Sequence, residues 1–497
     1  MIRAFSCLAV ALAAFPLFAQ DAERGFEPFS YDFSAEAALA ARIDVDNPDP
    51  VQLREIFAKR RARVMEAMPE GAMIVYSVER AQERRLEFQV PESDNHDFTY
   101  LTGLDGLFSL DSALLLLPAA TDAEGRLDEP VRDWVVLYTS MDPAAIAART
   151  GIEDVRPFDV LEQDLSVAMT DFRDWRITQV RRWPLAAALS RAWGADNKVL
   201  YFNYPRFFRL GMPEPVRLQQ FERIRRFSPE IRLRDSAEIL DQVRQLQDSW
   251  AIANLRRSVA IANEGVRHGF SSTRPGMTEM QVMQIIDFVY RYRGASLGFP
   301  TSVRRTGVRT PHDEGEDIPE GWIAFVPRSG IEVFRAGDLV WTDTGAAFNH
   351  YSADIQRTAP IDGRFTERQR ELYEIALDVQ KTVIGMVRPG ATWWQLHDRA
   401  MEMLRDAGGY DEYYYYGIGH FIGMDVHDEG DYLVPFKPGM ALAIEQGVMP
   451  PEGPRVAFED DVLVTDDGHE WLSRMIPLEI EDVEALTSGS AAFEFLE

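Results

Sequence analysis

Apolar positions along the first half of the chain follow two different spacings. Residues 51–68 carry apolar side chains at helical intervals with basic residues between them, which is typical of an amphipathic helix. Short apolar runs follow at 72–78, 111–119 and 133–140, and runs of this length are typical of buried strands. Strands that alternate with helical stretches predict an α/β domain over residues 51–235.

Two segments of this half are less regular. Residues 20–50 are polar and rich in Pro and Asp, which predicts an N-terminal extension in the form of an extended arm. Residues 94–104 combine turn-forming and aromatic residues and predict a packed loop.

The second half repeats one turn signal between predicted helices. Arg-Pro-Gly-Met-Thr occupies 274–278 and Arg-Pro-Gly-Ala-Thr occupies 388–392, each with a helical pattern on both sides. Pro-Gly ends one helix and Thr can cap the next, so one copy indicates only a helix–turn–helix, whereas two copies indicate a duplicated half-domain. We therefore predict an α+β domain over 245–497 with helices outside, antiparallel strands inside and a ligand site in the cleft between its halves.

A predicted β-hairpin in this domain, with strands 339–344 and 351–358, carries two carboxylates. If its turn is centred on 348–349, Asp343 faces Asp354, and two like charges placed opposite each other repel. A folded protein tolerates such a pair when it is exposed to solvent, when one carboxyl is protonated, or when a cation lies between the two. The hairpin by itself leaves all three alternatives open.

Three later segments carry further groups that bind metals. A Gly-rich stretch, 416–428, contains His420 and His427, and glycine lets the backbone approach a ligand closely. Glu445 and Glu459 each interrupt an apolar strand, where an unpaired charge is very unfavourable.

These segments together predict a metal centre. The set of ligand candidates is Asp343, Asp354, His420, Glu445 and Glu459. Four carboxylates and one imidazole suit two divalent ions, Mn²⁺ first, then Co²⁺, Fe²⁺ or Zn²⁺. Two such ions can bind a bridging hydroxide as nucleophile and polarise a carbonyl group at the same time. For each of these residues taken alone, a purely structural role is the alternative to metal binding.

The overall charge excludes some partners. The chain has 52 Lys and Arg residues against 80 Asp and Glu residues, a net charge of −28. Such an acidic protein is not expected to bind nucleic acid or an anionic membrane. Its 46% hydrophobic residues are typical of a globular protein with large cores.

The N-terminus predicts export. Residues 1–19 have a basic start, a short apolar run and a small residue before a polar segment, which is typical of a secretory signal peptide, with an uncleaved anchor as the alternative. The protein is then periplasmic or secreted. The one cysteine, Cys7, lies in this segment, so disulfides and cysteine-bound metals are excluded from the mature chain. No other run is apolar enough to span a membrane.

With these segments, the sequence resembles the pita-bread metallopeptidases, specifically aminopeptidase P and prolidase, over nearly the whole mature chain. DLVWTDTG and YSADIQRTAPIDGRFTERQ resemble the family segment with the first two metal aspartates, GIGHFIGMDVHD its histidine segment, and AIEQG and FEDDVLVTDDG its two glutamate strands. FAKRRARVMEAMPEGAMIVYSV and DFTYLTGL resemble its non-catalytic N-terminal domain. The resemblance implies the pita-bread fold, with pseudo-two-fold duplication, for the C-terminal domain.

The resemblance also implies a role for each candidate ligand. Asp343 would bind one ion, and Asp354 and Glu459 would bridge both. His420 would bind one ion. Glu445 would be a ligand and the base that activates the bridging water.

The implied reaction is hydrolysis of the peptide bond before a proline at a peptide N-terminus. His427 matches the family histidine that hydrogen-bonds the substrate carbonyl or the tetrahedral intermediate. The implied partner is therefore a proline-containing peptide. The family also implies a homo-oligomer, a dimer or tetramer.

Several positions depart from the family pattern. Tyr416 stands where the family often has histidine, Ala457 where it commonly has arginine, and Gln446 where it has proline. The family has one further histidine in its substrate site. Its position corresponds to Val326 when residues are counted back from Asp343 of the hairpin, and to His312 when they are counted forward from Gly307.

The forward alignment makes 313–322 an insertion, and His312 and Tyr416 are then candidate substrate-binding residues.

The departures leave two alternatives to an exported Xaa-Pro aminopeptidase. One is a prolidase-like dipeptidase or another amide or ester hydrolase on the same site. The other is a catalytically silent protein that binds peptides.

Overall fold

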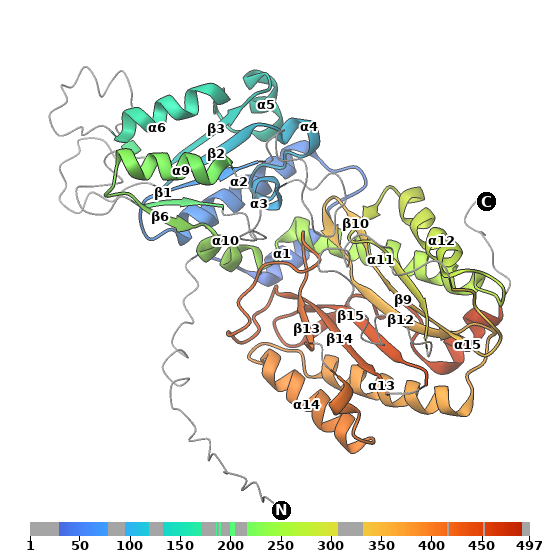
Figure 1. Cartoon of the computed structure of the whole chain (residues 1–497). Coiled ribbons are helices and arrows are strands. Elements are labelled where there is room, and N and C mark those ends of the chain that lie inside the picture. The colour runs from blue at the N-terminus through green and yellow to red at the C-terminus, as the bar shows by residue number, and fades with distance from the viewer. Residues whose placement is uncertain are drawn as a thin grey trace, which may run out of the picture.

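The computed structural model describes residues 29–77, 95–118, 133–169, 185, 188–189, 199–203, 216–306, 332–414, 417–450 and 453–489. They form two regions that follow each other along the chain, with helix α10 (Ala237–Arg244) between them (Figure 1). The predicted signal peptide and the 313–322 insertion lie outside the described residues. The predicted domain boundaries stay predictions.

The N-terminal region is built on a six-stranded sheet in the order β4-β3-β2-β1-β5-β6. The strands are β1 (Ala72–Tyr76), β2 (Ser112–Leu117), β3 (Trp134–Thr139), β4 (Asp154–Pro157), β5 (Val199–Phe202) and β6 (Arg232–Asp235). The helices are α2 (Pro50–Ala67), α3 (His96–Thr102), α4 (Gly106–Ser109), α5 (Pro143–Thr150), η3 (Phe158–Val160), α6 (Leu161–Met169) and α9 (Val216–Phe227). Every residue of β1 and β2 is buried, because α2 packs on one face of the sheet and α6 and α9 pack on the other. The predicted α/β organisation is confirmed.

Two local predictions in this half are wrong. The predicted arm contains helix α1 (Phe33–Ala40), whose N-cap residue Asp32 accepts a hydrogen bond from the Ala35 amide at 3.0 Å. An N-cap before an Ala-rich run favours a helix over an extended arm. The predicted loop at 94–104 contains α3, because Asn95 caps its start and Gly103, with φ of 69°, ends it.

The C-terminal region contains a curled antiparallel sheet in the order β13-β14-β15-β12-β9-β8, with β16 beside β15. Its strands are β8 (Ser302–Arg305), β9 (Leu339–Thr344), β12 (Ile355–Pro360), β13 (Gly419–Phe421), β14 (Ala441–Val448), β15 (Val456–Val464) and β16 (His469–Trp471). A smaller sheet joins β7 (Ser296–Leu297), β10 (Ala346–Phe348) and β11 (Tyr351–Ser352). The helices are α11 (Ser249–Ser272), α12 (Glu279–Tyr292), α13 (Glu367–Gly385), α14 (Trp393–Asp406), η5 (Tyr410–Tyr413) and α15 (Ile480–Ser488).

The predicted α+β class, with antiparallel strands and outer helices, is therefore confirmed, and the repeated turn connects equivalent helices. α11 leads to α12 and α13 leads to α14, and each second helix begins with a threonine capping box. The amide of Gly276 donates to the Phe334 carbonyl at 2.8 Å, and the amide of Gly390 donates to the Phe436 carbonyl at 2.9 Å. Both glycines have positive φ, 96° and 84°, in the region that favours glycine. The two halves thus use the same turn.

Buried ion pairs join the N-terminal region to the C-terminal one. Arg60 of α2 is 1% exposed. Its guanidinium donates to both oxygens of Asp248, the N-cap of α11, at 2.6 and 2.8 Å, and to the Tyr351 hydroxyl at 2.8 Å. A basic residue of the predicted amphipathic helix is therefore an interdomain contact.

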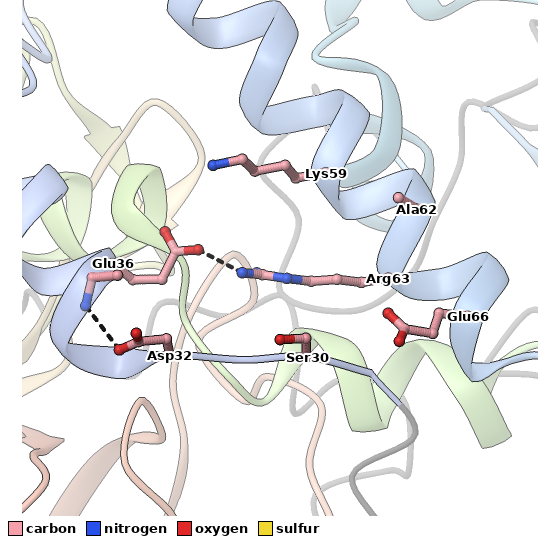
Figure 2. Close-up of a pocket in the computed structure, with 8 residues that line it drawn as sticks. Ser30, Asp32, Glu36, Lys59, Ala62, Arg63 and Glu66 are labelled. Carbon is pink, nitrogen blue, oxygen red and sulfur yellow. Dashed lines mark hydrogen bonds and ion pairs between the residues drawn. The ribbon is translucent and has the colours of Figure 1, made fainter.

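A shallow pocket of about 300 Å³ lies between α1 and α2 (Figure 2). Its lining is Ser30, Asp32, Ala35, Glu36, Lys59, Ala62, Arg63 and Glu66. Glu36 and Arg63 form an ion pair across it at 2.5 Å, and none of the candidate ligands lines it. Among the described residues, no helix combines the length and the apolar character needed to cross a bilayer.

Candidate metal centre

The turn of the hairpin lies one residue later than predicted, which shifts the strand register by two residues. The turn is 349–350, and both of its residues have positive φ, 48° and 71°, as in the two-residue turns that match strand twist. The expected centre at 348–349 is therefore wrong, and Asp343 pairs with Gln356 instead of Asp354. The sequence signal for this turn is weak, because Asn-His lacks the glycine that usually occupies such a position.

The correct register builds one continuous row across four strands. Asp343 on β9 is opposite Gln356 on β12, which is opposite Glu459 on β15, which is opposite Glu445 on β14. Cross-strand partners point to the same face of a sheet. Three carboxylates from distant parts of the sequence therefore share one face, with a single amide among them.

Asp354 and His420 complete the group. Asp354 lies two residues before Gln356 and so faces the same side. His420 on β13 places its Nε2 3.2 Å from an oxygen of Glu459 and 3.5 Å from an oxygen of Asp354. Ligand atoms of Asp354, His420 and Glu459 all lie within 4.8 Å of one another, and all three residues are buried.

The histidine ring is oriented for metal binding. Its Nδ1 lies 3.0 Å from the Phe421 carbonyl oxygen, and a carbonyl can only accept, so Nδ1 carries the hydrogen. Nε2 faces the carboxylates, and after it loses its proton its lone pair can bind a metal there, which is the arrangement of a metal-bound histidine. The preceding Gly419 has φ of 146°, and a Cβ there would lie 2.0 Å from the Ala443 carbonyl oxygen. Glycine therefore lets β13 approach β14 closely at this point.

The charges of the group repel each other without a cation. Burial, and next the charge on Glu459, raise the pKa of Asp343 and of Asp354 well above the usual range. The same two causes raise the pKa of Glu445 to about 8. Burial alone would lower the pKa of His420, but the carboxylates of Asp354 and Glu459 outweigh it and raise the pKa well above its usual value. Each direction follows from crowding of negative charge.

These residues fit a metal ion. One oxygen of Asp354 is buried and has no hydrogen-bond partner, and such an atom needs a partner or a cation. The donor set is rich in carboxylate oxygens with one imidazole, which hard to borderline divalent metals prefer. The structure thus brings all five predicted ligands to one face. Their assignment as ligands stays a prediction.

His427 lies on the loop after β13. Its ring centroid is 4.3 Å from that of His420, and the two rings are nearly perpendicular, at 88°. Desolvation of the ring and the charge on His420 lower its pKa, so the ring is neutral at pH 7. A neutral imidazole beside the ligands can donate a hydrogen bond to a substrate oxygen.

The departing residues lie in different places. Gln446 donates its side-chain amide to the Ala376 carbonyl of α13 at 2.6 Å, so it faces away from the carboxylate row. Ala457 lies two residues before Glu459, and strand alternation places its small side chain on the face of the row. His312 and Tyr416 lie outside the described residues.

Two residues of the site were not predicted from the sequence. Gln356 donates its amide to the carboxylates of Glu459 and, at 3.3 Å, of Glu445. Asp461 accepts a hydrogen bond from the Asp354 amide at 3.1 Å. Strand alternation already places Gln356 on the face of Asp354, so that signal was available; the Asp461 contact spans distant strands and gave none.

Gln356→Leu tests the amide in the row. It removes donors to two carboxylates, and hydrogen bonds to charged groups contribute about 1.5–3 kcal/mol each. We expect the free energy of unfolding of the metal-free protein to fall by about 2 kcal/mol, and the loss to shrink in saturating Mn²⁺, because cations then partner the carboxylates. Urea denaturation with chelator and with Mn²⁺ measures both values.

Gln446→Leu is the matched control, because it removes a buried glutamine amide on the opposite face. Its destabilisation should be equal with and without metal. A Gln356→Leu effect that is also independent of metal would contradict the expectation.

Comparisons with known proteins agree with this geometry. Residues 253–466 match the sequence profile of Metallopeptidase family M24. Over 470 residues the chain is 25% identical to the Xaa-Pro aminopeptidase of Escherichia coli strain K12, covering 87% of this chain and 97% of that protein. It is 29% identical over 244 residues to the Xaa-Pro dipeptidase of Pyrococcus furiosus, covering 48% of this chain and 65% of that protein.

The fold is also found among solved structures. A substituted variant of aminopeptidase P from Escherichia coli superimposes with a TM-score of 0.67 at 22% identity, covering 87% of this chain and 98% of that chain. Both the N-terminal and the C-terminal regions are therefore shared with that fold.

Proposed function

We propose that the chain is an aminopeptidase P-like hydrolase that cleaves the N-terminal Xaa-Pro bond of peptides, since residues 253–466 match metallopeptidase family M24 and the full-length chain is similar to an Xaa-Pro aminopeptidase. The observation that carries the proposal is the convergence of four carboxylates and one imidazole on one face of the C-terminal sheet. The full-length similarity to a bacterial Xaa-Pro aminopeptidase supports the substrate class.

The geometry suggests which residues hold each ion. Asp354 and Glu459 lie in the middle of the group and would hold both ions. Asp343 is at one end of the row, and His420 and Glu445 are at the other. When bound, two ions lower the pKa of a water molecule and polarise the scissile carbonyl.

Glu445 is the proposed general base. It stands at the end of the row, and burial together with the charge on Glu459 raises the pKa of its carboxyl to about 8. With the ions bound, this carboxyl would be ionised, and it could then take the proton of the attacking water and return it to the departing proline nitrogen. Its hydrogen bond from Gln356 orients the carboxylate while it does so.

His427 is the proposed donor to the substrate. The ring is neutral at pH 7 and lies against His420. An N–H directed at the carbonyl oxygen stabilises the negative charge that develops there. His427 thus acts on the substrate, whereas His420 acts as a ligand.

The finer identity of the site is also proposed. We propose Mn²⁺ as the metal, because the donors are mostly carboxylate oxygens. We propose export to the periplasm or beyond, because residues 1–19 resemble a signal peptide.

The experiment combines metal analysis with a peptide assay. Purified protein starting at Gln20 is analysed for metal and incubated with Mn²⁺ and Arg-Pro-Pro. The proposal expects two ions per chain and release of arginine. Bound metal without cleavage would point to another amide or ester substrate, and absence of bound metal would overturn the proposal.

A prolidase-like dipeptidase is the second candidate. The similarity of the catalytic half to an archaeal Xaa-Pro dipeptidase favours it, but that similarity covers only 48% of this chain. Parallel assays on Arg-Pro and Arg-Pro-Pro separate the two. Cleavage of the dipeptide alone would establish the dipeptidase.

Metal affinity should depend on pH. Because the pKa of Glu445 is about 8 in the metal-free site, the carboxyl holds a proton at lower pH, and an arriving ion must displace it. We expect the apparent affinity for Mn²⁺ to fall by about tenfold or more per pH unit from pH 8 to pH 6, because the raised pKa values of Asp343, Asp354 and His420 add further protons for the ion to displace. Calorimetric titrations in buffers of different ionisation enthalpy measure the affinity and the released protons. An affinity that is constant over this range would contradict the expectation.

A further inference from the structure

We propose that Arg244 is a positioning residue, which holds the loop 423–429, and with it His427, from outside the catalytic sheet. The proposal rests on the proposed function, because that function gives His427 its contact with substrate. Arg244 is the last residue of α10 and is 3% exposed. It touches none of the candidate ligands.

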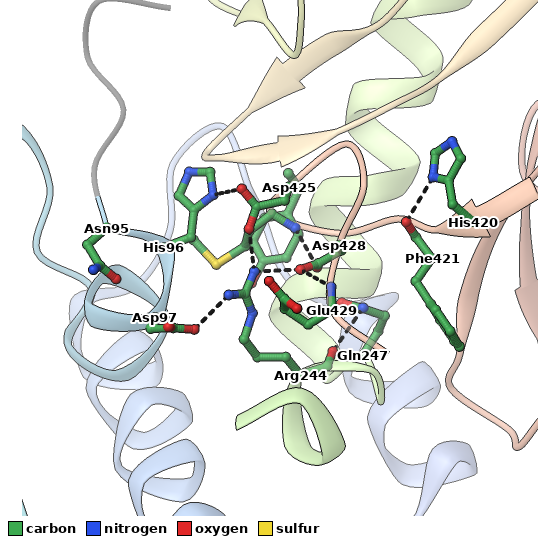
Figure 3. A network of polar contacts seen from close by, with 12 residues as sticks. Asn95, His96, Asp97, Arg244, Gln247, His420, Phe421, Asp425, Asp428 and Glu429 are labelled. Carbon is green, nitrogen blue, oxygen red and sulfur yellow. Dashed lines mark hydrogen bonds and ion pairs between the residues drawn. The ribbon is translucent and has the colours of Figure 1, made fainter. Parts of the chain in front are cut away.

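The guanidinium of Arg244 joins carboxylates of both regions (Figure 3). Its Nη1 contacts Asp97 of α3 at 2.7 Å. Its Nη2 contacts Asp425 at 2.8 Å and Asp428 at 2.5 Å, both on the loop. One planar side chain thus fixes two positions of the loop relative to the N-terminal region.

His96 is a second link from α3 to the same loop. Its Nδ1 lies 2.8 Å from one oxygen of Asp425, and the other oxygen of Asp425 contacts Arg244. Figure 3 shows both residues directed at Asp425, each toward a different carboxylate oxygen. The carboxylate is therefore held in one orientation.

The loop is closed around Asp428. This carboxylate accepts hydrogen bonds from the amides of Met424 at 2.9 Å and of Glu429 at 2.8 Å, and the Asp428 amide donates to the Phe421 carbonyl at 2.9 Å. A Cβ on Gly423 would lie 1.9 Å from an oxygen of Asp428, so only glycine permits this closure.

His427 stands between the two residues that the guanidinium holds. Asp425 is two residues before it and Asp428 is the next residue. A small displacement of a group that contacts substrate can lower a rate about a hundredfold. We therefore expect loss of the Arg244 contacts to lower the rate of peptide cleavage, because the His427 ring is then displaced.

Two conservative variants test the proposal. Arg244→Lys keeps the charge but loses the planar fork, and Asp425→Asn changes a carboxylate that is 41% exposed. We expect each variant to bind two Mn²⁺ ions and to lower kcat on Arg-Pro-Pro tenfold to a hundredfold with little change in KM, because the lost interaction acts in the transition state.

A double-mutant cycle shows whether the effect passes through His427. Arg244→Lys combined with His427→Ala should be less than twofold slower than His427→Ala alone. Asp105→Asn is the matched control, since Asp105 contacts His350 across the same two regions at 3.2 Å without touching the loop. It should leave kcat within twofold of wild type.

The outcomes separate this proposal from the proposed function. Failure of wild-type protein to cleave any of the peptides would refute the function alone. In that case amide hydrogen exchange in 423–429 decides, since Arg244→Lys should accelerate it relative to wild type and to Asp105→Asn. The role of Arg244 would be overturned if Arg244→Lys left the hydrogen exchange of 423–429 unchanged, or if it left kcat unchanged. It would also be overturned if the double variant with His427→Ala showed the full product of the two single losses in kcat.

Discussion

Glu445→Ala lowers kcat/KM on Arg-Pro-Pro by a factor of about 10³ or more, in our expectation. Loss of a general base alone reduces a rate by about 10²–10⁴, and this residue also stands in the row that is expected to hold the ions. Steady-state kinetics in saturating Mn²⁺ measure the loss of activity. Metal analysis of the same sample shows how much of that loss comes from weaker metal binding. Glu445→Gln keeps the size of the side chain and should be nearly as slow.

Glu470→Ala is the matched control for this loss. Glu470 lies on β16 next to the same sheet, where it forms a partly exposed ion pair with Arg256 at 2.6 Å. Its replacement should leave kcat/KM within twofold of wild type. Activity of Glu445→Ala within tenfold of wild type would exclude Glu445 as the base.

Arg357→Leu should lower the free energy of unfolding by about 3–5 kcal/mol, because it leaves a buried carboxylate without its cation. Arg357 is 1% exposed and contacts Asp460 at 2.5 Å. It also donates to the Glu459 carbonyl at 2.7 Å and to the Gln356 carbonyl at 2.9 Å. The side chain thus connects β12 to β15 behind the carboxylate row. Urea denaturation of the metal-free protein measures the loss.

Two further variants show whether that loss of stability comes from the unpaired buried charge. Arg357→Leu with Asp460→Leu removes both charges and should recover most of the stability, since replacement of a whole buried pair by apolar groups is often neutral. Arg256→Leu breaks the partly exposed pair with Glu470 and should change stability by less than about 1 kcal/mol. A loss from Arg357→Leu as small as that from Arg256→Leu would show that the buried pair is not a strong contact.

Local signals predicted many of the elements correctly. The apolar runs at 72–78, 111–119 and 133–140 contain β1, β2 and β3, because the length and composition of a buried strand are properties of the strand itself. The repeated Pro-Gly turns and their threonine caps follow from contacts within a few residues. The misses at α1 and α3 were of the same local kind, since Asp32 and Asn95 are caps that the sequence already displays.

The candidate site was predictable as a set of residue types but not as a geometry. Carboxylates at Glu445 and Glu459 within apolar strands predict a partner of opposite charge, since burial alone would be too unfavourable. Which groups become neighbours depends on register, and the turn at 349–350 moved the partner of Asp343 from Asp354 to Gln356.

The sequence by itself therefore determined the fold class, many of the strands and helices, and the kinds of ligand that a metal centre would need. The tertiary structure decided the row across four strands, the amide of Gln356 within it, and the hold of Arg244 on the His427 loop. The physical reason is the range of the interactions. Propensity and capping act over a few residues, whereas the partners of a buried charge are chosen by packing between segments far apart in the chain.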